Sequence, residues 1–193
     1  LPTTAGIHPE RFSDHLVFAQ NRTLVAVILG LMLVIGFALR MNGLGTESLS
    51  EDELNKLQAV QEYRSSGLTG KNGEHPFLMK GLQLVSVITA EKINNSIALP
   101  QPAISDEAAL RFPVALFGTF TLILLYLLFS ELFGRSIGLL AGVFWAVEPM
   151  AIGFDRIAQE GSLVLFFFLL SNLFWLRCPR ARAHLVKNWK RQV

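Results

Sequence analysis

Four long hydrophobic stretches divide the chain, and polar segments separate them. Residues 23–39 and 112–130 carry no charged side chain, residues 136–154 carry one, Glu148, and residues 161–176 form a shorter stretch rich in phenylalanine. A helix needs about 20 largely apolar residues to cross a hydrocarbon core, and about 17 can suffice. The pattern therefore predicts four transmembrane helices over these ranges.

Residues 40–111, between the first two stretches, are too long for a plain connector and contain helical periodicity of their own. From residue 54 to residue 63, apolar side chains recur every three or four positions, which predicts an amphipathic helix over about 49–63. Ser50 precedes Glu53 by three residues, the spacing of a capping box at a helix start. We therefore expect this helix to begin at Ser50.

A second helix is predicted over about 76–97, with Pro76 in its first turn, where the missing N–H does no harm. Its uncharged part covers only residues 81–90, which is too short to cross a membrane. We expect this helix to lie along the membrane surface. The alternative is a fifth span, which would place the two ends of the chain on opposite sides.

Composition supports a protein of the bilayer. Hydrophobic residues make up 51% of the chain and the mean hydropathy is +0.43, values that exclude an ordinary soluble domain. The single cysteine, Cys178, excludes an internal disulfide framework and a cysteine-rich metal site. No glycine-rich phosphate loop is present. The predicted fold is thus all-α and integral to the membrane, with an outer loop that carries two amphipathic helices.

Charge gives an orientation. The segment 177–193 holds six Lys and Arg residues and no acid, which predicts a cytoplasmic tail. With four spans, residues 1–22 would also be cytoplasmic and the loop 40–111 would face outward. We expect the membrane to be a bacterial cytoplasmic membrane. A lipid-binding or nucleic-acid-binding arm is the alternative for the tail. Basic charge beside a span is the more usual topology signal, so we expect no nucleic-acid partner.

Three consecutive acids, Glu51, Asp52 and Glu53, open the helix predicted at 49–63. One or two acids would already meet the preference of a helix N-terminus for negative charge, which contributes only about 0.3–1 kcal/mol. The cluster is therefore a candidate functional site. Its oxygens could bind a divalent cation, but consecutive helical residues cannot all point at one ion, so we predict no metal site.

The link between the last two spans also faces outward on this topology, and it carries Asp155, Arg156 and Glu160. Arg156 and Glu160 are four residues apart and could simply pair with each other. The functional alternative is a polar site in which carboxylates accept protons and cations hold a phosphate. His75 and Lys80, at the start of the second outer helix, are two more groups that suit a phosphate.

The order of five short motifs resembles a known family. The motifs are LSEDE at 49–53, HPFLMK at 75–80, RFPVALFGT at 111–119, LFGR at 132–135 and DRIA at 155–158. Together they resemble the N-terminal part of GT-C glycosyltransferases that use polyprenyl-phosphate sugars, such as the protein O-mannosyltransferases and the lipid A aminoarabinose transferases.

This resemblance implies an inverting sugar transfer at the outer membrane face, from a lipid-linked donor. Asp52 would be the catalytic base, with Glu53 beside it as a second catalytic candidate. The groups expected at the carrier phosphate are His75, Lys80 and Arg156. Asp155 and Glu160 would support the site or face the acceptor.

The chain also departs from the family pattern. Ser50 or Glu51 stands where an aromatic residue commonly precedes the DE pair, Phe77 replaces a second proline, and Asp155 replaces a serine. Family members have more spans and usually a C-terminal soluble domain. We therefore expect either an enzyme seen in part, or completed by other membrane chains, or a non-catalytic subunit of a membrane complex. A transporter or channel would need charges within the spans, where only Glu148 lies.

Overall fold

The computed structural model describes residues 21–67, 70–97 and 102–178. Within these ranges the chain forms helices and no strands, as the sequence predicts. The helices are α1 (Arg22–Met41), α2 (Glu51–Ser66), α3 (Phe77–Ile97), α4 (Asp106–Phe133), α5 (Arg135–Val147), α6 (Pro149–Phe154) and α7 (Gly161–Arg177). Most of the two predicted cytoplasmic segments, 1–22 and 177–193, lies outside the described residues.

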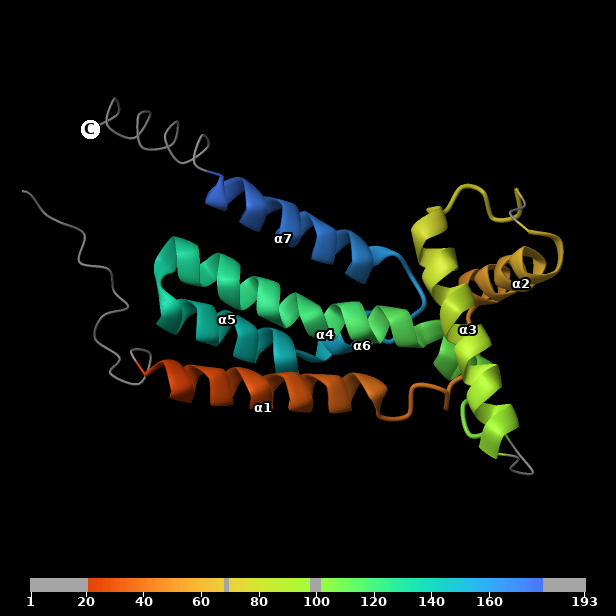
Figure 1. The fold of residues 1–193 in the computed structure, drawn as a ribbon, viewed down its shortest axis with the longest axis horizontal. Coiled ribbons are helices and arrows are strands. Elements are labelled where there is room, and N and C mark those ends of the chain that lie inside the picture. Colours follow the sequence, from red (N-terminus) through yellow and green to blue (C-terminus); the bar gives the residue numbers. More distant parts are fainter. Residues whose placement is uncertain (1–20, 68–69, 98–101, 179–193) are drawn as a thin grey trace, which may run out of the picture.

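The long axis of the molecule follows a bundle of apolar helices. Figure 1 shows α1, α4, α5 and α7 running along this axis, while α2 and α3 gather at the end where α1 finishes and α4 and α7 begin. Helix α3 runs across the axis. A helix so placed would lie along the surface of a membrane crossed by the bundle, which is the arrangement predicted for 76–97.

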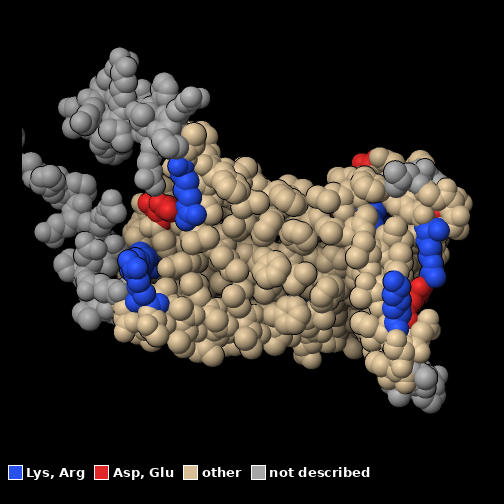
Figure 2. Space-filling view, in the orientation of Figure 1, with Lys and Arg blue, Asp and Glu red and all other residues tan. Residues whose placement is uncertain are grey.

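The apolar surface of the bundle suits a bilayer. Helices α1 and α4 are long and apolar enough to cross a membrane, and α5 and α7 are shorter apolar helices. On the face drawn in Figure 2, charged side chains gather at the two ends of the molecule and leave a wide uncharged band between them. The structure thus fits a membrane protein, while the count of four spans remains a prediction.

The third predicted span is not one continuous helix. Helix α5 ends at Val147, and α6 begins at Pro149 with Glu148 as its N-cap, whose side chain accepts a hydrogen bond from the Ala151 N–H. Proline has no N–H to continue the α5 hydrogen-bond ladder. The prediction of a single helix over 136–154 is therefore wrong, because Pro149 breaks it.

Arg40, at the end of α1, occupies the break between α5 and α6. Its fully buried guanidinium donates to the carbonyls of Trp145, at 3.0 Å, and Ala146, at 3.4 Å, and its Nε lies 2.7 Å from Asp155 Oδ2. In a continuous helix the Trp145 carbonyl would accept from residue 149, which is a proline. Arg40 therefore supplies the donors that the break removes.

The end of the molecule that carries α2 and α3 has its own hydrophobic core. Val60 of α2, Val87 of α3, Leu110 of α4 and Ala158 of the link before α7 are all buried in this cluster. Burial of such side chains contributes roughly 1.5–3 kcal/mol each for the larger ones. The cluster holds α2 against the start of α4 and against the link. It therefore fixes the relative positions of the elements that carry the polar site.

Candidate functional site

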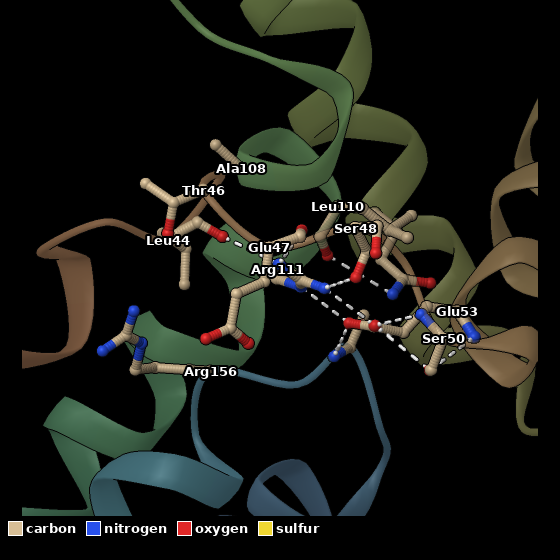
Figure 3. A network of polar contacts seen from close by, with 12 residues as sticks. Leu44, Thr46, Glu47, Ser48, Ser50, Glu53, Ala108, Leu110, Arg111 and Arg156 are labelled. Carbon is tan, nitrogen blue, oxygen red and sulfur yellow. Dashed lines mark hydrogen bonds and ion pairs between the residues drawn. The ribbon is translucent and has the colours of Figure 1, made fainter.

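The Glu53 carboxylate is the centre of a polar network that joins three parts of the chain (Figure 3). Arg111 of α4 donates from Nε to Glu53 Oε1 at 2.7 Å and from Nη2 to Oε2 at 2.9 Å. The Ala158 N–H, in the link before α7, donates to Oε1 at 2.9 Å. Glu53 thus ties α2 to α4 and to the link between α6 and α7.

The capping box predicted from the sequence is confirmed. The Ser50 hydroxyl accepts from the Glu53 N–H, and Glu53 Oε2 accepts from the Ser50 N–H at 3.0 Å. Burial alone would raise the pKa of Glu53, but hydrogen bonds from Arg111, Ala158 and Ser50 outweigh it and lower this pKa to about 2. A carboxylate so fully paired acts as an anchor and is poorly placed to accept a proton.

Arg111 also fixes the segment between α1 and α2. Its Nη1 donates to the carbonyls of Leu44, at 3.0 Å, and Glu47, at 2.9 Å, and its Nη2 donates to the Ser48 carbonyl at 3.1 Å. These donors satisfy backbone groups that belong to no helix. The start of α2 is therefore held from both sides, by its own cap and by α4.

Asp52 lies next to this anchor and has a different environment. Its side chain is exposed, and its carboxylate makes no hydrogen bond or ion pair with any residue that the structure describes. Because Lys56 is four residues further along α2, the two side chains share one face, with their Cβ atoms about 6 Å apart. Asp52 is thus an available carboxylate on a helix start that cannot easily move.

His75, Lys56 and Glu160 meet at one point, although they come from three separate segments. Lys56 Nζ lies 3.2 Å from Glu160 Oε1, and His75 Nδ1 lies 3.1 Å from the same oxygen. Lys56 is 1% exposed, whereas His75 is 31% exposed. Of the predicted site residues, the structure brings His75 and Glu160 together and adds Lys56, which the sequence analysis missed.

Lys80 is buried beneath the turn that precedes α3. Its Nζ donates to the Asn72 carbonyl and lies 5.6 Å from the centre of the Tyr63 ring. Asn72 has a left-handed backbone conformation, with φ of 53°, which an asparagine adopts at modest cost. Lys80 therefore faces the turn that it supports, and not an open surface where a phosphate could reach it.

Arg156 and Asp155 are neighbours with different surroundings. Arg156 is half-buried and donates from Nη2 to the Gly43 carbonyl at 3.1 Å; Figure 3 shows its side chain near the turn at Leu44 and Thr46. Asp155 is buried and is bound by Arg40 and by the Ser162 hydroxyl. Arg156 and Glu160 have separate partners, so the simple pairing between them does not occur.

An apolar groove runs beside this network, with a cavity volume of about 790 Å³. Its walls come from α3, from the start of α4 and from the turn at residues 44–46. The same turn follows Gly43, the residue that binds Arg156. The groove is therefore next to one of the cations of the site. Within the described residues, the site included, no group of three or more His, Cys, Asp or Glu side chains could hold a metal ion.

Comparison with known proteins relates part of the chain to a family. Residues 103–189 match the model of the family described as dolichyl-phosphate-mannose-protein mannosyltransferase. The match includes Arg111, Arg156 and Glu160, but the segment with Asp52 and His75 lies outside it. No curated protein and no solved structure matches the chain. Over residues 103–189 the chain is thus similar to the mannosyltransferase family, whose members are GT-C membrane glycosyltransferases, which agrees with the resemblance of its motifs.

Proposed function

We propose that the chain transfers a sugar from a polyprenyl-phosphate carrier to a hydroxyl or amine at the outer face of the membrane. The observation that carries this proposal is Asp52, an exposed carboxylate without a partner among the described residues, on a helix start that Glu53 fixes to α4 and to the link before α7. The family match over residues 103–189 supports a membrane glycosyltransferase of the mannosyltransferase kind.

In the proposed reaction the acceptor oxygen or nitrogen attacks the anomeric carbon of the sugar and gives its proton to Asp52. The bond between that carbon and the phosphate oxygen breaks, and the phosphate leaves with the electron pair, so the configuration at the carbon inverts. General-base catalysis of this kind requires a carboxylate within reach of the acceptor. The negative charge on the leaving phosphate calls for cations at the same surface.

Arg156 and His75 are the cationic groups that best fit the carrier phosphate. Both side chains are partly exposed. Arg156 bonds Gly43 in the segment before α2, and His75 contacts Glu160 in the link whose Ala158 N–H binds Glu53. Arginine suits a phosphate because its planar guanidinium can donate two parallel hydrogen bonds. Lys80 fits this role less well, since its ammonium is buried and already bound.

The apolar groove supports a lipid carrier as the donor. It opens between α3 and α4 and is bounded by the turn that holds Arg156, so a chain lying in it would bring its head group close to a cation. Apolar side chains dominate its lining, as in sites for apolar ligands generally.

We further propose that the outer loop faces away from the cytoplasm of a bacterium, with both termini inside.

Replacement of Asp52 tests this function directly. In membrane vesicles from cells that make the protein, we expect Asp52→Asn to lower the release of polyprenyl phosphate from a labelled polyprenyl-phosphate sugar by about 100-fold or more, because the general base is lost. The matched control is Glu51→Gln, which removes an equally exposed charge from the same helix turn and should leave the rate nearly unchanged.

If Asp52→Asn and Glu51→Gln vesicles released carrier at the same rate as the wild type, Asp52 would not be the base. A wild-type chain without any transfer activity would instead favour the second reading, a non-catalytic subunit that keeps the glycosyltransferase fold.

A further inference from the structure

We propose that Glu160 and Lys56 are positioning residues, which orient the His75 ring so that its Nε2 meets the phosphate of the lipid donor. The identity of this phosphate rests on the function proposed above. The arrangement of the three side chains rests on geometry alone: His75 lies in the turn before α3, Lys56 in α2 and Glu160 in the link before α7.

The contact between His75 and Glu160 determines which ring nitrogen is left for a ligand. His75 Nδ1 lies 3.1 Å from Glu160 Oε1. The contact has the distance of an ion pair and is not a hydrogen bond in the described structure. We infer a proton on Nδ1, because a lone pair there would lie against the negative charge of the oxygen. The second nitrogen, Nε2, is then the ring atom that can face a ligand, and the ring is exposed enough to be reached.

Lys56 keeps the Glu160 carboxylate in place. Its ammonium is almost fully buried and lies within 3.3 Å of both carboxylate oxygens, and its side chain leaves α2 one turn after Asp52. A buried charge is stable only beside its partner, so this pair resists displacement. Through Lys56, the same helix carries the proposed base and fixes the orientation of His75.

A ring protonated on both nitrogens can bridge two anions, with Glu160 at Nδ1 and a phosphate oxygen at Nε2. Hydrogen bonds between charged partners are roughly twice as strong as those between neutral ones. Glu160 therefore does not compete with the phosphate for His75. It contacts the ring at one nitrogen and leaves the other nitrogen for the phosphate.

Lys80, in the first turn of α3, supports the turn from which His75 projects. Its Nζ and the His75 N–H both donate to the Asn72 carbonyl, the latter at 3.2 Å. Two donors on one oxygen hold the turn from which His75 projects. The cation in the HPFLMK motif thus supports the loop, and the histidine of the motif takes the contact with the phosphate.

The test combines nuclear magnetic resonance of the imidazole with the binding of a defined probe, farnesyl phosphate. With the full chain in detergent micelles and ¹⁵N-labelled histidine, His75→Gln identifies the His75 signals. In the wild type we expect a proton on Nδ1 without ligand and a shift of the Nε2 signal on addition of farnesyl phosphate, but not of farnesol. Glu160→Gln should change the tautomer equilibrium and weaken farnesyl phosphate binding about 3- to 10-fold.

Three further variants separate the roles. Lys56→Met, which keeps the length of the side chain, should act in the same direction as Glu160→Gln. Glu74→Gln makes the same chemical change in an exposed acid next to His75. It should change neither the tautomer equilibrium of His75 nor the binding of farnesyl phosphate. Arg156→Gln should weaken binding without changing the signals of the unliganded His75 ring.

The proposal is overturned if farnesyl phosphate leaves the His75 signals unmoved, or if Glu160→Gln behaves like Glu74→Gln. Neither result depends on sugar transfer, which the Asp52 variants measure. A failure of the positioning role can therefore be told apart from a failure of the proposed enzyme activity.

Discussion

Glu53 and Asp52 are consecutive residues, yet their carboxylates have opposite surroundings. Successive residues of a helix point about 100° apart, so the turn that buries Glu53 against Arg111 leaves Asp52 exposed. The sequence identifies the capping role of Glu53, because the spacing to Ser50 is local. The Arg111 partner could not be read in this way, since it lies 58 residues further along the chain.

Loss of the Glu53 charge should destabilise the fold. We expect Glu53→Gln to lower the free energy of unfolding by about 3–5 kcal/mol, because the buried Arg111 guanidinium loses its counter-charge. The difference in unfolding free energy between the wild type and Glu53→Gln should also depend on pH. The pKa of Glu53 is lowered from 4.5 to about 2, so its contribution is fully present above pH 4.5 and is lost as the pH falls through about 2.

Denaturant titrations in detergent between pH 7 and pH 2 measure this effect, with Glu51→Gln as the exposed control. Equal stabilities of the Glu53 and Glu51 variants at pH 7 would show that the network around Arg111 does not hold α2.

At the scale of helices, close approach between α4 and the link before α7 explains a glycine of the RFPVALFGT motif. A Cβ atom at Gly118 would overlap the carboxylate of Asp155, which Arg40 and Ser162 hold in place. The sequence shows the motif but not this reason, because Asp155 follows two helices later. Pro149 can likewise be read from the sequence, but the prediction of one helix over 136–154 did not take its missing N–H into account.

Gly118→Ala should therefore cost about 1–3 kcal/mol of unfolding free energy, as overpacking in a well-filled site does. Gly30→Ala in α1 is the matched control, because a Cβ atom there would meet nothing within 4 Å. Thermal unfolding of the two variants in the same detergent measures the difference. A Gly118→Ala protein as stable as Gly30→Ala would mean that Asp155 can move aside freely.

For the molecule as a whole, the bundle places α2 and the end of α7 at opposite ends (Figure 1). Hydrophobic length and charge depend on composition along single segments, and they predict that α2 and the basic tail lie on opposite sides of a membrane. That topology stays a prediction. The joining of His75, Lys56 and Glu160 could not be predicted, because it depends on how α2, α3 and the link pack against one another. Arg40 was missed for the same reason: it looks like an ordinary charge at the end of a span.

The single cysteine provides a test of the orientation. Cys178, directly after α7, is exposed and free. In intact cells we expect a membrane-impermeant maleimide to leave Cys178 unlabelled, because this end faces the cytoplasm on the proposed topology. The double variant Cys178→Ser, Ser66→Cys places a thiol at the end of α2 and should be labelled.

A permeant maleimide should label both proteins and so controls for reactivity. Labelling of Cys178 by the impermeant reagent, with Ser66→Cys protected, would reverse the orientation and place Asp52 on the cytoplasmic side.

The position of Arg40 has a consequence for biogenesis. In a bilayer, the carbonyls freed by Pro149 cost several kcal/mol until a donor reaches them. The required donor lies on α1, which leaves the ribosome before α5. If both segments lie in the membrane, the pair α5–α6 obtains these donors when it docks against α1, so α1 would serve as an internal template for the later helices.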